Sequence, residues 1–367
     1  MNPYDPNNPV APAYFGGRKT LLRGADEAIE RVIQGRHTGM LIYGHRGIGK
    51  TSAVKAIEAR TGDRMPIVHV ALNAPTDKQS LVERLIAEIG AAIREASGFL
   101  SRLSDKGRAL LARVEGGEFL GIGVSLKERR STPDVALKES LLRVKDAAKL
   151  CIALDDADWM EKEALALLKT KTEELSSPSL LIIVSGGPEL REQLVSEYSP
   201  VIRFFSGFTY DLSEFTLEET REALELPAKG TGAEWSREAV DRVQSLTSGY
   251  PYLVQCVARA AFRLGRIDEA DIHKATNNAM DIAGTWLGGE LTEASDKDVI
   301  AFAKLSSLGK KDIVAKEAAQ AGVQGVYLKR LVKLGVLKNP HRAHYTLAKA
   351  PLVALYQVQV RGLRPDK

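Results

Sequence analysis

A chain of 367 residues is long enough for two or three domains, each able to bury its own core. With 44% hydrophobic and 27% charged residues it has the composition of a globular protein, which excludes a disordered or fibrous chain. The formal net charge of +4 at pH 7 is unevenly spread, because residues 296–367 hold 14 Lys and Arg against 5 Asp and Glu. Such a basic end indicates a polyanionic partner, although charge alone does not prove one.

Residues 1–14 predict an extended arm, because prolines recur at positions 3, 6, 9 and 12. This stretch has neither a basic start nor an apolar core, so no secretory signal or transit peptide is expected. No apolar run approaches the roughly 18 residues of a membrane helix, and we expect no membrane partner. Cys151 and Cys256 lie in apolar runs without C-x-x-C spacing, which disfavours a metal site or disulfide and fits a reducing cytoplasm.

Residues 44–51, GHRGIGKT, match the phosphate-binding pattern G-x-x-x-x-G-K-[ST] at every fixed position. An apolar strand is predicted at 39–43 and a helix from Lys50 onward, which is the strand-loop-helix context that the pattern requires. Backbone N–H groups and the start of the helix bind phosphate oxygens in such a loop. The pattern therefore predicts a nucleotide site with Mg²⁺.

Two residues of this loop have specific expected roles. Lys50 is expected to reach the β- and γ-phosphates, and the Thr51 hydroxyl to bind Mg²⁺. The guanine-reading pattern N-K-x-D is missing and no pocket of a small-molecule kinase is legible, which disfavours both of those classes. The loop residues predicted to bind the nucleotide are Gly44, His45, Arg46, Gly47, Ile48, Gly49, Lys50, Thr51 and Ser52.

Four further apolar segments predict strands that alternate with helices. This order predicts a parallel sheet covered on both faces. An insert at about residues 97–134 contains alternating apolar residues at 120–126, typical of a strand loosened by glycines. Two interpretations stay open, an edge strand of the core or an exposed hairpin that contacts a partner or nucleic acid. The four strands are predicted at 65–72, 149–158, 179–187 and 208–212.

The strand at 149–158 ends in two adjacent acids, Asp155 and Asp156, where a Walker B motif is expected. Asp155 is expected to orient the waters of a bound Mg²⁺, and Asp156 to polarise the water that attacks the γ-phosphate. The alternative interpretation is a solvated strand end. Next to a phosphate-binding loop, the catalytic interpretation is the one we adopt, with Lys50, Asp155 and Asp156 as catalytic residues and Thr51 and Asp155 as metal ligands.

Two polar residues lie near the ends of later strands. Ser185 follows the apolar run of the strand at 179–187, where it can sense the γ-phosphate or can be an ordinary turn residue. Arg203 precedes the last strand, where an arginine finger for a neighbouring subunit of a homo-oligomer would lie. A surface arginine is the alternative.

The pattern of the chain changes after residue 212, and we divide it there. Residues 1–212 are predicted to form a P-loop ATPase core with a parallel sheet and an N-terminal extended arm. Residues 213–290 carry only helical apolar stripes and predict an all-helical lid. Residues 291–367 predict three helices and a hairpin with a basic turn, the order of a winged helix-turn-helix.

With these parts in this order, the chain resembles AAA+ and STAND ATPases of the origin-recognition type that end in a winged helix. The resemblance implies an ATP-dependent switch, in which ATP closes the lid on the core and hydrolysis or ADP release opens it. Four segments carry the resemblance most specifically: YFGGRKTLL (14–22), GHRGIGKTS (44–52), CIALDD (151–156) and SGYPYLVQ (248–255).

The resemblance adds two nucleotide contacts and reveals two departures. Arg18 lies in a segment that in the family contacts adenine, and Pro251 lies in a lid motif that approaches the nucleotide. Tyr252 stands where initiators of the family carry the sensor 2 arginine. Most hydrolysing relatives carry Glu where this chain has Asp156, which is one methylene shorter. Both departures predict a slow regulator rather than a fast motor.

The helix predicted at 324–334 is the expected recognition helix of the winged module. Phosphate contacts from its basic residues and from the wing would give salt-dependent binding of duplex DNA. The alternative is a protein-interaction switch whose winged helix serves autoinhibition or assembly with a protein partner and leaves the charges solvated. The basic residues are Lys329, Arg330 and Lys333 of the helix, and Lys338, His341, Arg342 and His344 of the wing.

Overall fold

The computed structural model describes residues 2–72, 74–100, 132–143, 149–197 and 199–365. The chain divides into two compact units. We call residues 11–13 and 18–212 the sheet unit, and residues 1–10, 14–17 and 213–367 the helical unit. None of the described helices combines the length and the apolar character needed to cross a membrane.

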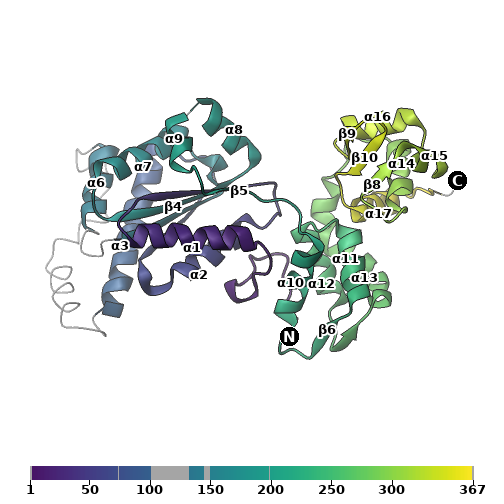
Figure 1. Cartoon of the computed structure of the whole chain (residues 1–367), viewed down its shortest axis with the longest axis horizontal. Coiled ribbons are helices and arrows are strands. Elements are labelled where there is room, and N and C mark those ends of the chain that lie inside the picture. Colours follow the sequence, from purple (N-terminus) through teal and green to yellow (C-terminus); the bar gives the residue numbers. More distant parts are fainter. Residues whose placement is uncertain (1, 73, 101–131, 144–148, 198, 366–367) are drawn as a thin grey trace. The chain divides into compact units, whose positions relative to one another are not determined.

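The sheet unit is built on a parallel sheet of five strands in the order β2-β3-β4-β1-β5 (Figure 1). All five predicted strands are present, and the predicted parallel sheet is confirmed. Strand β4 lies between β1 and β3. The residues that follow β4 therefore lie next to the loop after β1 and to the residues after β3. The strands are β1 (Thr38–Tyr43), β2 (Ile67–Ala71), β3 (Lys149–Asp155), β4 (Ser179–Gly186) and β5 (Thr209–Asp211).

Helices cover both faces of this sheet, as the almost continuous burial of β3 and β4 requires. Helices α1 (Lys19–Ile33) and α2 (Lys50–Thr61) pack together on one face (Figure 1). Alternate strand residues such as Ile152 and Ile182 point to the opposite face, where they join one apolar cluster with the remaining helices. These are α3 (Lys78–Leu100), α6 (Pro133–Arg143), α7 (Lys162–Glu174), α8 (Pro188–Glu197) and α9 (Ser199–Phe204). The strand expected at 120–126 lies outside the described residues.

The first part of the helical unit is the predicted lid. Its helices are α10 (Leu217–Ala228), α11 (Arg237–Thr247), α12 (Pro251–Ala261) and α13 (Glu269–Gly288). The lid is helical except for one pair of three-residue parallel strands, β6 (Ala233–Trp235) and β7 (Gly265–Ile267). This pair forms because the two segments that connect the helices run side by side, with the Gly265 amide bonded to the Gly232 carbonyl at 2.8 Å.

The N-terminal arm packs in the helical unit, although its place in the chain predicts that it belongs with residues up to 212. Tyr4 is 0% exposed, and its ring makes edge contacts with Trp235 and Phe262 at centroid distances of 6.0 and 5.9 Å. The Tyr4 hydroxyl donates to the Leu224 carbonyl and accepts from the Trp235 indole N–H at 2.8 Å. Burial of an aromatic ring with both hydrogen bonds satisfied explains this placement.

The rest of the helical unit is a winged helix. Its helices are α14 (Asp296–Ser306), α15 (Ala315–Gln320), α16 (Gly325–Lys333) and α17 (Pro351–Val360). Strands β9 (Leu337–His341) and β10 (His344–Leu347) form the predicted hairpin. A further strand, β8 (Asp312–Val314), lies where only helices are expected before the hairpin, and it pairs antiparallel with β10. Its β-branched Ile313 and Val314 favour a strand, and Ile313 is buried there.

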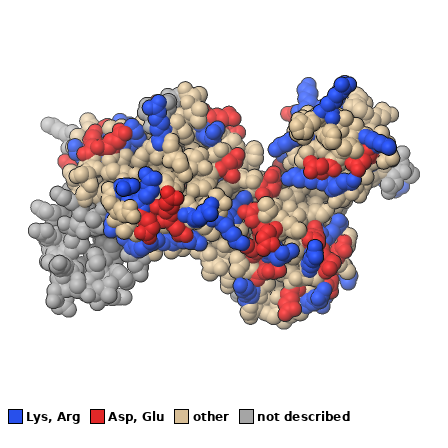
Figure 2. Space-filling model, in the orientation of Figure 1, with Lys and Arg blue, Asp and Glu red and all other residues tan. Residues whose placement is uncertain are grey.

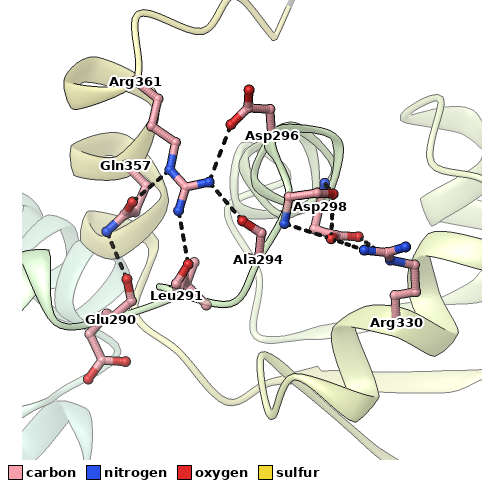
Figure 3. A network of polar contacts seen from close by, with 9 residues as sticks. Glu290, Leu291, Ala294, Asp296, Asp298, Arg330, Gln357 and Arg361 are labelled. Carbon is pink, nitrogen blue, oxygen red and sulfur yellow. Dashed lines mark hydrogen bonds and ion pairs between the residues drawn. The ribbon is translucent and has the colours of Figure 1, made fainter.

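The last helix, α17, returns to the junction between the lid and the winged helix (Figure 3). Gln357 donates to the carbonyls of Leu287 and Glu290 at 3.0 and 2.8 Å. Arg361 donates to the carbonyls of Leu291 and Ala294 at 2.9 and 2.8 Å. Carbonyl groups at the end of α13 and after it therefore receive hydrogen bonds from α17 side chains, which ties the winged helix to the lid.

Candidate nucleotide-binding site

The predicted phosphate-binding loop connects the end of β1 with the start of α2. Gly47 and Gly49 have φ angles of 82° and 96°, a region that favours glycine. A Cβ atom on Gly44 would lie 2.7 Å from the Leu212 carbonyl oxygen, so glycine is required there for close backbone packing. Lys50 is the first residue of α2, and its ammonium donates to the carbonyls of Gly44 and His45 at 2.9 and 3.3 Å. The Lys50 ammonium group therefore lies against the backbone carbonyls of its own loop.

Arg18 reaches the same loop from outside. It precedes α1 in a left-handed conformation, with φ 57°, and is 9% exposed. Its Nη2 atom donates to the Ile48 carbonyl at 3.4 Å. A second cation, predicted from the resemblance alone, therefore lies at the loop.

Asp155 is the last residue of β3 and Asp156 follows it, while Ser185 lies near the end of β4. The Ser185 hydroxyl is 0% exposed and donates a hydrogen bond to the carboxylate of Asp155, which is 2% exposed. The Asp156 amide donates to the same hydroxyl oxygen at 3.4 Å. Since Ser185 also lies beside Ile42 in the register of β1, it stands between the phosphate-binding strand and the acidic strand.

Asp156 has an unusual environment for a carboxylate. Its backbone is left-handed, with φ 56° and ψ 44°. Burial, followed by the charge of Asp155, raises the pKa of Asp156, while the charges of Lys50 and Arg46 partly oppose that rise. The charges of the loop therefore act on the carboxylate of Asp156.

Asp158, which is not among the predicted site residues, also contributes to this region. Asp158 accepts hydrogen bonds from the Gly187 amide with both carboxylate oxygens, at 2.7 and 2.8 Å. This fixes the turn after β4, and the charge of Asp158 adds to the raised pKa of Asp156. The third acid in the run ALDDAD was the signal available for it.

The structure gathers most of the predicted site residues in the sheet unit. Loop residues 44–52, Asp155, Asp156 and Ser185 lie at or after the carboxyl ends of its strands or on α2, and Arg18 lies directly before α1. Pro251 belongs to the helical unit, where it is buried as the first residue of α12. Tyr252 follows it and packs against Trp286 with a centroid distance of 6.1 Å. Arg203 is exposed on α9.

The basic residues of the winged helix differ in whether they already form an ion pair within the fold. Arg330 donates to the carboxylate of Asp298 from Nε and Nη2 at 2.8 and 2.7 Å, and Asp298 is buried (Figure 3). This pairing commits two of its donors, so Arg330 is first a structural residue. Basic side chains stand over α16 in Figure 2. Within the described part of the chain, no ion pair engages the exposed Lys329, Lys333, Lys338 and Arg342.

A parallel sheet in this order, with a glycine loop after β1 and acids at the end of β3, is the fold of P-loop ATPase domains. Residues 14–183 match the family described as AAA ATPase domain. A relative from Methanocaldococcus jannaschii, described as an uncharacterized HTH-type transcriptional regulator, is 25% identical over 358 residues, which are 92% of this chain and 87% of the relative.

Solved structures of low sequence identity share the fold over nearly the whole chain. The Walker-type ATPase of Pyrococcus abyssi matches with a TM-score of 0.56 and 19% identity, over 93% of this chain and 95% of that one. The Orc2 protein of Aeropyrum pernix, in its ADPNP-ADP complexes, matches with a TM-score of 0.55 and 17% identity, over 94% of each chain. The predicted resemblance to origin-recognition ATPases is confirmed, and an AAA ATPase domain implies nucleotide binding.

Proposed function

We propose that this protein binds ATP with Mg²⁺, hydrolyses it slowly, and uses the nucleotide to switch the binding of duplex DNA by its winged helix. The observation that carries the proposal is the convergence of Lys50, Asp155 and Ser185 at one edge of the sheet. Loop amides and two cations can hold a triphosphate there, and a buried carboxylate lies on the neighbouring strand.

The residues present fit a magnesium nucleotide. Gly47 and Gly49 have positive φ angles that let the loop backbone curve closely around phosphate groups, and the Lys50 ammonium lies against the carbonyls of the same loop. Thr51 and Asp155 would hold the ion, which supplies positive charge against the β- and γ-phosphates. Ser185 positions Asp155 through its hydrogen bond.

Asp156 is the proposed general base for the attacking water. Its raised pKa makes it a better proton acceptor than an ordinary aspartate. Because Asp is one methylene shorter than Glu, it reaches less far toward that water, and we propose slow turnover. Pro251, at the start of α12, is proposed to approach the nucleotide when the lid closes.

Duplex DNA is the proposed partner of the winged helix. Four exposed cations, Lys329, Lys333, Lys338 and Arg342, form no ion pair with another described residue and support this. The relative described as an HTH-type transcriptional regulator, which matches over 92% of this chain, supports it as well. The rival function is a protein-interaction switch of the STAND kind. The commitment of Arg330 to Asp298 favours that rival, since it engages one of the cations in the fold.

Calorimetry on the intact chain with ATP and Mg²⁺ tests the nucleotide site. We expect binding by the wild type, loss of binding by at least about tenfold in Lys50→Ala, and slow phosphate release only by the wild type. Absence of heat from the wild type would refute the nucleotide switch. Phosphate release equal to that of Lys50→Ala, with and without DNA, would remove hydrolysis from the proposal.

A salt titration of duplex DNA binding by the intact chain, with ATP or ADP, separates the two partner hypotheses. We expect log affinity to fall linearly with log salt concentration, and to differ between the two nucleotides. No binding at 50 mM salt would favour the protein-interaction switch. A homo-oligomer in which Arg203 acts on a neighbouring subunit remains a prediction, which sedimentation with and without ATP would test.

A further inference from the structure

The exposed face of α16 carries its charges at one end only. Val326, Lys329 and Lys333 are three, four and seven residues apart and share one exposed face, while Leu328 and Leu331 are buried on the other. The basic residues lie in the second half of the helix. The first half presents Gln324, Gly325 and Val326, none of which is charged.

Val326 is 56% exposed, one of the most exposed large apolar residues in the described parts of the chain. A single exposed valine is ordinary on a protein surface. Its position is what matters, since the N-terminal residues of a recognition helix are those that face base edges in the major groove.

The neighbours of Val326 leave room for a close approach. A Cβ atom on Gly325 would meet nothing within 4 Å, so the helix start is open on that side. The Gln324 side chain is exposed and does not cap the helix, although Gln324 occupies the cap position. The side chains of Gln324 and Val326 are thus available to a partner that reaches the start of α16.

The surrounding charges define where DNA phosphates would lie. Lys329 and Lys333 follow along the helix, and Arg342 stands at the tip of the hairpin between β9 and β10. The pairing of Arg330 with the buried Asp298 anchors α16 to α14. Phosphate contacts would therefore flank the uncharged helix start, which leaves that start for the bases.

We infer that Val326 and Gln324 read an A·T-containing step of duplex DNA. Val326 contacts the C5 methyl group of a thymine, and Gln324 makes paired hydrogen bonds to N6 and N7 of an adenine. Lys329, Lys333 and Arg342 contact phosphates and carry no sequence information. This inference rests on the proposed binding of DNA and adds the base that is recognised.

Atomic substitutions in DNA test each contact directly. Sites are first selected by the intact chain from a random duplex pool, and each thymine is then replaced by deoxyuridine, which lacks only the methyl group. We expect one replacement to weaken wild-type binding about fourfold, the effect of one buried methyl group. Val326→Ala should bind the thymine and deoxyuridine duplexes equally.

The adenine contact is tested with 7-deazaadenine, which lacks N7. We expect about a tenfold loss for the wild type at one adenine and no loss for Gln324→Ala. Lys329→Gln is the matched control, since it should keep both base sensitivities and reduce the slope of log affinity against log salt by about 1. Thermal melting should be unchanged in all three variants, because the three side chains are exposed.

The outcomes separate the inference from the proposed function. Salt-dependent binding with no selected sequence, or a methyl sensitivity that survives Val326→Ala, overturns the reading by Val326 while DNA binding stands. An N7 sensitivity that survives Gln324→Ala overturns the role of Gln324. No DNA binding at any salt concentration overturns both the inference and the proposed DNA function.

Discussion

The Ser185 hydroxyl donates to the Asp155 carboxylate across neighbouring strands, and both groups are almost completely buried. Ser185 therefore does more than terminate β4. It supplies a hydrogen bond to a carboxylate that water barely reaches, and it lies beside the strand that leads into the phosphate-binding loop. The sequence offers two interpretations of Ser185, and its contact with the γ-phosphate stays a prediction beside this observed hydrogen bond to Asp155.

Replacement of Ser185 by Ala should reduce both stability and turnover. The buried Asp155 carboxylate loses a donor, which costs about 2 kcal/mol of unfolding free energy. Turnover should fall by about tenfold or more, because Asp155 loses its orientation. Ser179→Ala is the control, since Ser179 is buried at the opposite end of the same strand. Equal losses of turnover in both variants would show that Ser185 acts only through the fold.

Replacement of Asp156 by Asn should stabilise the chain at pH 7 and stop hydrolysis. The folded state raises the pKa of Asp156 above its usual 3.8, so the ionised carboxylate is disfavoured in the fold. That penalty is present above the folded pKa and disappears as the pH falls below 3.8. Asn also tolerates the left-handed backbone at this position.

Denaturant unfolding of the Asp156→Asn chain at several pH values measures this effect. The gain in stability should shrink as the pH is lowered toward 4. Asp158→Asn is the control, since an Asn oxygen can still accept from the Gly187 amide and turnover should persist. A gain that does not depend on pH would contradict the electrostatic explanation.

Arg330 and Lys329 are neighbours on α16, and replacing them should affect different properties: stability for Arg330 and DNA binding for Lys329. Arg330→Gln leaves Asp298 with fewer donors and should cost about 2 kcal/mol of unfolding free energy. Lys329→Gln should change stability by less than about 0.5 kcal/mol but weaken DNA binding. Urea unfolding and a salt titration on both variants check this. If Arg330→Gln kept full stability, the anchoring of α16 would be refuted.

The same pair predicts a dependence of stability on pH. Burial alone would raise the pKa of Asp298, but hydrogen bonds from Arg330 and Ser295 hold it below 3.8. The stabilisation is therefore present above pH 3.8 and is lost as the pH falls through the lower folded pKa. In Arg330→Gln this loss at acid pH should be smaller.

Removal of the Tyr4 hydroxyl should destabilise the helical unit. Tyr4→Phe leaves the Leu224 carbonyl and the Trp235 indole N–H without their buried partner, at a cost of about 2 kcal/mol. Tyr14→Phe, at a position that is 41% exposed, should have almost no effect. Unfolding followed by tryptophan fluorescence compares the two. Equal stability of both variants would mean that the arm contributes nothing to the lid.

The sequence predicted the parts whose signals are local. The glycine loop, the two acids and the five strands are each encoded by a short contiguous stretch of sequence. In each stretch the residue types explain the local structure, as the glycines permit the turn before Lys50. The bounds of α16 were also predicted within a residue or two, because Leu328 and Leu331 mark its buried face.

Contacts between residues that are far apart in the sequence were not predicted. Nothing near Tyr4 indicates that its ring packs against Trp235, and nothing near Arg330 indicates a buried partner at position 298. Strands β6, β7 and β8 were missed because three residues are too few for a periodic pattern, and their partners lie outside the local sequence. Such pairings depend on tertiary packing, which periodicity does not report.

The Tyr4 hydroxyl meets its carbonyl partner across 220 positions of the chain. A ribosome therefore releases the arm well before the helix that receives it, and the entire sheet unit is synthesised in between. Until Leu224, Trp235 and Phe262 have been synthesised, Tyr4 lacks the partners that bury it, and its ring is exposed in the nascent chain. Tyr4 is therefore buried only after the lid has been synthesised. A translation product that ends before the lid would leave the Tyr4 ring exposed to solvent.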